Sequence, residues 1–138
     1  MQPANFDQET NATLAALCEP PPLTVEVHHH LPAVVVDVGG ELDAFTAPRL
    51  LATLQAVLRE RSPVLIVDLT AVRFMGSAGI SVLLETYQRA GPHTTLRIVA
   101  PSRTTLLPLQ VTHLDTVLDL YPSRPDALAA PEPSRPTT

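Results

Sequence analysis

Ser77 is the residue whose surroundings look most like a reactive site. It stands in the run GSAG over residues 76–79. A hydrolase nucleophile elbow needs glycine two residues before and two residues after its serine, and Met75 occupies the first of these positions. The only acid between Ser77 and His113 is Glu85, inside the helix that Ser77 would open, so no serine–acid–histidine triad is completed. The motif therefore argues against esterase chemistry, and we predict that the chain is not an enzyme.

Other chemical motifs are incomplete as well. The chain has no lysine, so a phosphate-binding P-loop cannot exist, and no GxGxxG run is present. His28, His29 and His30 suggest a metal, but in a strand successive rings point to opposite faces. At most His28 and His30 would share a face, and two ligands without a nearby third favour a solvent-exposed edge strand. We therefore predict no metal and no cofactor.

Glu41 and Asp43 form a pair of carboxylates in one loop. Acid–base catalysis would require burial to separate their pKa values. The simpler interpretation is two solvated acids, with Asp43 helping to hold the turn before Thr46.

Composition limits the classes of protein that this chain can represent. Its 138 residues carry a formal charge of −5 and are 45% hydrophobic. We expect one domain over residues 23–128, between a flexible acidic tail (1–22) and a proline-rich disordered tail (129–138). A nucleic-acid binder would need a basic face, and no apolar run approaches the roughly 20 residues that span a bilayer. The single Cys18 excludes an internal disulfide, and the first basic residue is Arg49, so we expect a cytoplasmic protein.

Short valine-rich runs alternate with helical periodicity along the predicted domain, which indicates an α/β fold: a mixed sheet of four to five strands with helices packed against it. The predicted strands cover residues 23–27, 33–38, 64–69, 96–100 and 116–120. The predicted helices begin at Thr46, Ser77 and Thr104 or Thr105, with a short last helix over 126–130.

Several local features refine these elements. Gly39-Gly40 should break or bend the second strand, and residues 70–76 should form a loop. In the helix from Ser77, an apolar stripe of Ile80, Leu83, Leu84 and Tyr87 should face the sheet. Pro108 should fall in the first turn of the third helix, where a missing N–H is tolerated.

Ser77 has two compatible interpretations at the start of its helix. As an N-cap, its hydroxyl would accept a bond from an early helix N–H. As a modification site, a phosphoryl group on it would gain from free N–H groups at the helix end and would add about −1.5 to −2 units of charge.

Three segments carry a family pattern. They are residues 39–58 (GGELDAFTAPRLLATLQAVL), 64–90 (VLIVDLTAVRFMGSAGISVLLETYQRA) and 96–123 (LRIVAPSRTTLLPLQVTHLDTVLDLYPS). Together they resemble the STAS domain, and more narrowly the bacterial anti-sigma-factor antagonists. The resemblance implies a small mixed sheet with helices and a regulatory protein without enzymatic activity. Its unphosphorylated form would bind an anti-sigma factor, often a serine kinase, and free the sigma factor.

The resemblance also assigns roles to residues. Ser77 matches the serine that the kinase phosphorylates to end the complex, and a phosphatase would reset the switch. Asp43 matches the family's acid before the first helix. The family usually has Asp where this chain has Gly76, and often a second hydroxyl residue where it has Ala78. His113 replaces a glycine at a helix end, a position that histidine tolerates.

The partner surface expected from this pattern surrounds Ser77. It comprises Asp43, Thr46, Met75, Gly76, Ala78, Ser81 and Glu85. Arg73 could instead pair with the phosphate. Two alternatives from other classes remain: a sensor that binds a nucleotide or lipid, with Ser77 only a cap, and a structural subunit of a signalling assembly.

Overall fold

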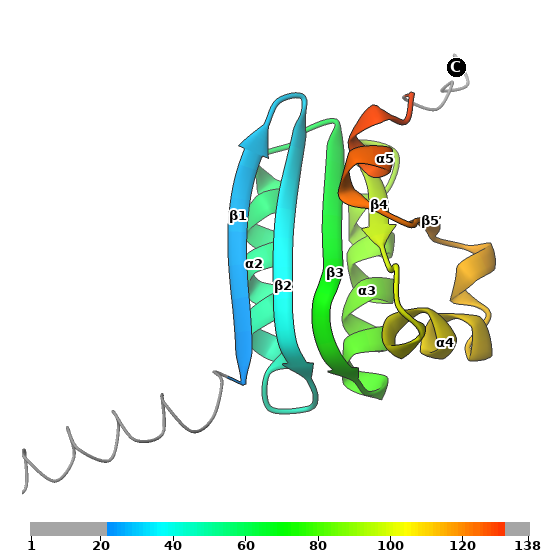
Figure 1. Cartoon of the computed structure of the whole chain (residues 1–138). Helices are drawn as coiled ribbons and strands as arrows, with labels where there is room; N and C mark the ends of the chain where they lie inside the picture. Colours follow the sequence, from blue (N-terminus) through cyan, green and yellow to red (C-terminus); the bar gives the residue numbers. More distant parts are fainter. Residues whose placement is uncertain (1–21, 132–138) are drawn as a thin grey trace, which may run out of the picture.

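The strands form one five-stranded sheet in which the spatial order follows the chain. A computed structural model describes residues 22–131. The strands are β1 (Leu23–His30), β2 (Ala33–Leu42), β3 (Val64–Met75), β4 (Thr95–Val99) and β5 (Asp119–Tyr121). The first pair is antiparallel and the other pairs are parallel, so the sheet is mixed (Figure 1). The predicted fold class is confirmed.

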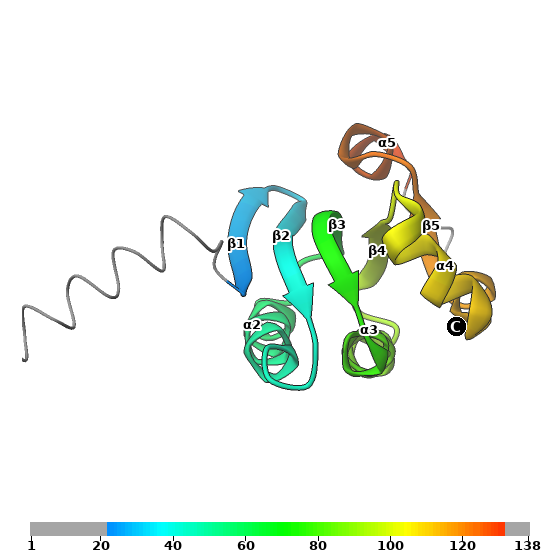
Figure 2. The same cartoon turned by 60° about the horizontal axis from the view of Figure 1, so that its bottom comes forward.

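The helices connect or follow the parallel strands. They are α2 (Ala47–Arg59), α3 (Ser77–Ala90), α4 (Arg103–Val111), the short 3₁₀ helix η1 (Leu114–Thr116) and α5 (Arg124–Ala129). Crossovers between neighbouring parallel strands share one hand, which places successive helices on the same face. Figure 2 shows α2 and α3 side by side under one face of the sheet, with α5 on the other face.

The sheet is buried on both faces at its centre. Side chains of alternating direction in β2 and β3 enter two clusters, a large one beneath α2 and α3 and a small one beneath α5. Leu50, Leu54 and Leu83 are fully buried in the large cluster, and each such burial stabilises the fold by about 1.5–3 kcal/mol. The double burial predicted for residues 64–69 is confirmed.

The predicted loop over residues 70–76 was wrong, because β3 continues to Met75. Its pairing with β2 extends as far as Leu42 opposite Met75, past two register shifts next to Gly39 and Gly40. These glycines bend β2 without ending it, and Gly40 has a φ of 96°. Each shift places one extra residue in β3, and the pairing resumes beyond it, so the ends of β2 and β3 lie side by side.

The third helix and the last strand also differ from expectation. The carbonyl of Ser102 accepts the N–H groups of Thr105 (3.3 Å) and Leu106 (2.9 Å), so Ser102 is the N-cap and Pro108 lies in the helix interior. Thr116 is bonded back to His113 in η1, so β5 begins only at Asp119. His113 has the expected left-handed backbone, with φ 62°.

The buried stripe of α3 is rotated relative to the prediction. Tyr87 is 43% exposed, while Val82 and Thr86 are buried in addition to Leu83. The predicted tails fall almost wholly outside the described residues, as does Cys18, so the predicted domain limits stay predictions.

Candidate functional site

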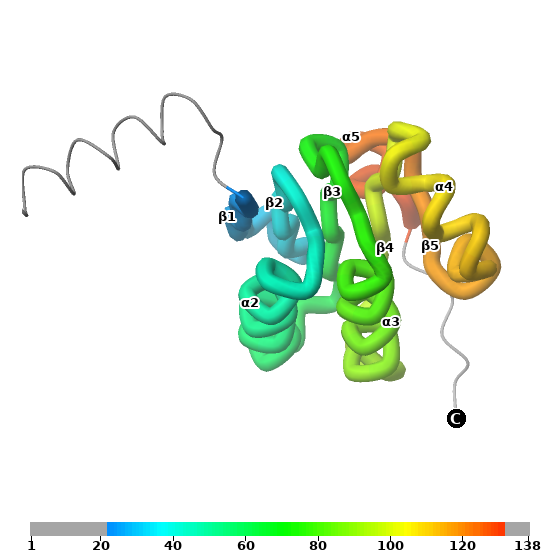
Figure 3. Tube along the Cα trace, turned by 90° about the horizontal axis from the view of Figure 1, so that it is seen from below, coloured from blue at the N-terminus to red at the C-terminus, as the bar shows by residue number. Residues whose placement is uncertain are grey.

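The loop that holds Asp43 and the start of α3 meet at one edge of the sheet. Leu42 and Met75 are register partners at the ends of β2 and β3, and the N–H of Gly76 donates to the carbonyl of Leu42 at 2.9 Å. Asp43 follows Leu42 and Ser77 follows Gly76, so this backbone hydrogen bond holds together the two segments that carry them. Figure 3 looks onto this edge from below, where β2 runs into α2 and β3 into α3.

Asp43 organises its own loop. One oxygen, Oδ1, accepts the N–H groups of Phe45 (2.9 Å) and Thr46 (3.0 Å). The pKa of Asp43 is held below its usual value, chiefly by the hydrogen bond from the Thr46 N–H. Hydrogen bonds from the Phe45 N–H and the Thr46 hydroxyl add to this effect, and desolvation opposes it. Asp43 therefore carries its negative charge at this edge. The expectation that it holds the turn before Thr46 is confirmed.

Thr46 completes the same loop. It is the N-cap residue of α2, as predicted, but its hydroxyl makes no bond to the helix. Instead, Oγ1 accepts the N–H of Asp43 at 3.0 Å and donates to the carbonyl of Glu41 at 2.7 Å. Thr46 and Asp43 therefore bind each other reciprocally, and the loop has a defined shape.

Ser77 is the first residue of α3 and is exposed. The prediction that it caps the helix was wrong: Gly76 is the N-cap, with extended backbone, and its carbonyl accepts the N–H groups of Gly79 (3.0 Å) and Ile80 (3.3 Å). Within residues 22–131, the Ser77 hydroxyl has no hydrogen-bond partner. No histidine of this part of the chain is hydrogen-bonded to the hydroxyl in a way that could activate it as a nucleophile.

Two glycines lie at the start of α3, and Gly79 is the one that lets the helix approach the strands closely. A Cβ on Gly79 would stand 2.9 Å from Met75 Cγ and 3.1 Å from Leu42 Cβ, so only glycine lets α3 pack against both strand ends. A Cβ on Gly76 would meet the Phe74 ring at 3.3 Å. Where the family pattern has Asp, this chain therefore has an aromatic ring lying over a glycine.

Phe45 and Phe74 are site residues that sequence reasoning missed. Phe45 is 93% exposed and Phe74 51% exposed, and they flank Asp43 and Ser77 on the same edge. The available signal was compositional: the chain has only three phenylalanines and no tryptophan. Two of those three stand within three residues of the predicted site.

The remaining predicted partner residues lie at different depths. Met75 is 6% exposed and supports the edge from beneath. Ala78 is half-buried and packs on the core, whereas Ser81 is exposed. Glu85 accepts from Arg89 Nε at 2.9 Å and from Gln55 Nε2 at 3.4 Å. A groove of about 520 Å³ runs along the outer face of α3, lined by Ser81, Leu84, Glu85, Gln88 and Arg89.

The family model for the STAS domain matches residues 24–127. The chain belongs to the STAS domain family. This match spans all five strands except Leu23, the helices α2, α3 and α4, the first part of α5, and both site loops. Within residues 22–131, no helix is long and apolar enough to cross a bilayer.

Relatives of this STAS domain are named for regulation of sigma factors. It is 33% identical over 109 residues to the anti-sigma-F factor antagonist RsfB of Mycobacterium tuberculosis, covering 79% of this chain and 89% of that protein. It is 40% identical to an anti-sigma factor antagonist from Mycobacterium paratuberculosis, with a TM-score of 0.76 over 80% of this chain and 94% of the other.

A more distant structure shares the fold. The anti-sigma factor antagonist SpoIIAA, in its unphosphorylated form, superposes with a TM-score of 0.60 at 15% identity, over 76% of this chain and 94% of its own. The STAS architecture is therefore kept at identities too low to compare individual site residues.

Proposed function

We propose that this STAS domain is an anti-sigma factor antagonist that works by partner switching. Its unmodified form binds an anti-sigma factor that is also a serine kinase, and the sigma factor is released. The kinase transfers the γ-phosphoryl group of ATP to Ser77 Oγ, the complex dissociates, and a phosphatase restores the serine. The names of the relatives support the antagonist role. The exposed hydroxyl of Ser77, without a partner in residues 22–131, is the observation that supports the switch.

The surface around Ser77 has the properties of a protein-binding site. We call it the docking edge: Asp43, Phe45, Thr46, Phe74, Gly76 and Ser77, together with Ala78, Ser81 and Glu85 of α3. Aromatic anchors such as Phe45 and Phe74 contribute strongly when a partner buries them. The groove along α3 extends the same surface for two further turns. Met75 holds this surface in place from the core side.

Charge supplies the switch. Unmodified Ser77 is small and neutral, so a partner can cover it. A phosphoryl group would bring about −1.5 to −2 charges next to the loop of Asp43, whose lowered pKa keeps it ionised. Burying unpaired charge costs several kcal/mol, and about 2.7 kcal/mol suffices for a hundredfold loss of affinity. No change of fold is needed.

The test of this function is phosphorylation by the partner itself. The full chain is incubated with the kinase-type anti-sigma factor of its own genome, ATP and Mg²⁺, and intact mass and peptide mapping are measured. We expect one phosphate, on Ser77, and release of the chain from the complex. A stable complex with no phosphate on Ser77 would contradict the proposal.

One observation favours the sensor as a second candidate function. A groove of about 560 Å³ lies between the C-terminal ends of α2 and α3, lined by Arg59, Arg61, Arg89 and His93 among others. Three of the chain's nine arginines meet there, so a phosphate-bearing ligand such as a nucleotide would fit its charge. Stabilisation of the chain by GTP or ATP that is lost in Arg59→Ala, without any phosphate gained, would support the sensor.

A further inference from the structure

Three carboxylates stand in one row across the sheet, on the face away from α2 and α3. Glu26 of β1 is the register partner of Asp37 of β2, and Asp37 is the register partner of Asp68 of β3. Neighbouring strands lie about 4.8 Å apart, so these acids are close neighbours. They share the face of Val35, whose cluster α5 covers in part.

Among residues 22–131, Arg124 is the only arginine that forms ion pairs with this row. Arg124 of α5 reaches Asp37 Oδ2 at 3.1 Å through Nη2 and Asp68 Oδ2 at 2.7 Å through Nε. Arg124 carries one positive charge and the three carboxylates carry three negative charges. Two negative charges are therefore not balanced by an arginine. Glu26 has only His28 beside it, and its side chain is 70% exposed.

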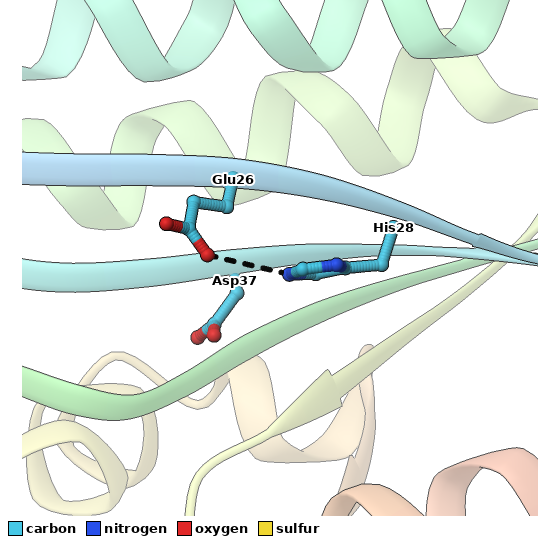
Figure 4. A group of neighbouring side chains, drawn as sticks. All are labelled: Glu26, His28 and Asp37. Carbon is cyan, nitrogen blue, oxygen red and sulfur yellow. Dashed lines mark ion pairs between the residues drawn. The ribbon is translucent and has the colours of Figure 1, made fainter.

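His28 turns the open end of the row into a cluster with metal-ligating atoms. It follows Glu26 by two residues on β1, so both side chains point to the same face. His28 Nε2 lies 3.4 Å from Glu26 Oε1, and the ligand atoms of Glu26, His28 and Asp37 all lie within 4.8 Å of one another. Figure 4 shows Glu26 and His28 of β1 pointing toward each other, with Asp37 of β2 beside them.

We propose that Glu26, His28 and Asp37 bind one divalent transition-metal ion, with zinc as the best match. One imidazole and two carboxylates are ligands that zinc accepts, with bonds of about 2.0–2.2 Å. Two such ligands at a tetrahedral angle are about 3.4 Å apart, which is the spacing of His28 and Glu26. Three protein ligands leave a fourth position open.

The charge of the ion suits the row. A divalent cation would neutralise the two negative charges that Arg124 leaves unpaired. Asp37 can serve both neighbours, because a carboxylate has two oxygens and about four lone-pair directions. Arg124 occupies Oδ2, so the ion would bind through the other oxygen. The ion would thereby connect the edge strand β1 with Asp37, which also forms the ion pair with Arg124 of α5.

Sequence periodicity alone did not reveal this site. It grouped His28 with His30 and found no third ligand, since the partner acid comes from the neighbouring strand. The pairing of Glu26 with Asp37 follows from the hairpin register, and that register fixes both acids on the face of His28. His29 points to the other face, where Nε2 lies 3.0 Å from Glu60 Oε1.

The test is zinc binding by the full chain, measured by titration calorimetry with ZnCl₂. Cys18→Ser is the background, which removes the only thiol of the chain. We expect one zinc per chain, and an affinity at least tenfold lower in His28→Ala and in Glu26→Gln. His29→Ala is the matched control and should change the affinity by less than twofold. Glu26 is exposed, so its amide variant leaves the fold intact.

Two outcomes would overturn the proposal. An equal loss in His29→Ala and His28→Ala would mean that zinc binds the histidine run without a defined site. An unchanged affinity in Glu26→Gln would mean that imidazoles alone hold the ion, since the His28 and His30 rings lie 6.4 Å apart on the same face. The result is independent of Ser77, so Ser77→Asp should bind zinc like the background.

Discussion

The N–H of Gly76 donates a 2.9 Å hydrogen bond to the carbonyl of Leu42, and this bond joins the two loops of the candidate site. It continues the parallel pairing of β2 with β3 one residue beyond Met75. The phosphoacceptor candidate Ser77 and the ionised Asp43 are the residues that follow. The pairing of β2 with β3 therefore brings Asp43 and Ser77 together. A partner that covers both residues would interact with any charge added to either one.

The first prediction concerns the two exposed phenylalanines. Phe45→Ala and Phe74→Ala should each weaken binding to the anti-sigma factor at least tenfold, about 1.4 kcal/mol, because aromatic anchors dominate such interfaces. Urea unfolding should show changes within about 0.5 kcal/mol for Phe45→Ala, since the ring is 93% exposed.

Leu31→Ala is the matched control for this pair. Leu31 is also a large, 79% exposed side chain, but it lies in the β1–β2 turn, at the opposite end of the sheet. Its replacement should leave affinity unchanged. Equal losses in Leu31→Ala and Phe45→Ala would contradict the location of the docking edge.

The second prediction concerns Gly79. Gly79→Ala should destabilise the domain by about 1–3 kcal/mol, because the new methyl group would overlap Met75 and Leu42 at the start of α3. Alanine's better helix propensity, worth up to about 1 kcal/mol, opposes this effect and should not cancel it. Urea unfolding measures the sum, and a stabilised Gly79→Ala variant would refute the close contact.

Gly76→Ala provides the comparison for Gly79. Its added Cβ would meet the half-exposed Phe74 ring at 3.3 Å, which can shift, and the Leu42 carbonyl oxygen at an ordinary 3.6 Å. The φ of −90° at Gly76 suits any residue. We therefore expect a change in the free energy of unfolding of less than about 0.5 kcal/mol.

The third prediction concerns acid stability through Asp68, which is 3% exposed. Burial raises the pKa of Asp68, but hydrogen bonds from Thr70 and Arg124 outweigh it and hold the pKa below its usual value of 3.8. A depressed carboxyl pKa stabilises the fold above the unfolded-state value, and this contribution is lost as pH falls through the folded-state pKa.

Asp68→Asn tests this contribution. It should lower the free energy of unfolding by about 1–3 kcal/mol at pH 7, since Arg124 loses its shorter ion pair. The difference from wild type should shrink as pH falls below about 4. Urea titrations at pH 7 and pH 3 measure both, and a difference that grows on acidification would contradict the assignment.

The fourth prediction concerns the Asp43 loop. Asp43→Ala should lower the urea midpoint and weaken partner binding, because the N–H groups of Phe45 and Thr46 lose their common acceptor. Asp43→Asn keeps an oxygen acceptor and should recover the midpoint, but it removes the charge. If Asp43→Asn recovers the urea midpoint, the stability of the loop depends on the oxygen acceptor and not on the charge. Identical midpoints for Asp43→Ala and Asp43→Asn would contradict the role of that acceptor.

Periodicity in the sequence was enough to predict the fold class and most elements. Valine-rich runs identified β1 and β2, and the run of residues 64–69 identified β3 as a buried central strand, because such strands are apolar on both faces. The length of β3 was not predictable locally, since residues 70–75 alternate poorly and are held in the strand by their partners in β2. The start of α4 was missed because Ser102, Thr104 and Thr105 are all reasonable caps in sequence terms.

The site was predicted in part for the same reason. Short-range chemistry was enough to predict the turn of Asp43 with Thr46, since this turn depends on neighbours in the chain. The role of Ser77 stays a prediction from the family resemblance. Phe45, Phe74 and the row of Glu26, Asp37 and Asp68 depend on strand register, which only the folded sheet supplies.

Partner affinity as a function of charge at Ser77 tests the central claim most directly. Ser77→Ala and Ser77→Asp are each titrated with the kinase-type anti-sigma factor in the absence of ATP, with Ser102→Asp as control, since Ser102 is also a helix-start serine but precedes α4. We expect Ser77→Ala and Ser102→Asp to bind like wild type and Ser77→Asp to bind at least tenfold more weakly. Equal affinities for Ser77→Ala and Ser77→Asp would contradict the charge switch.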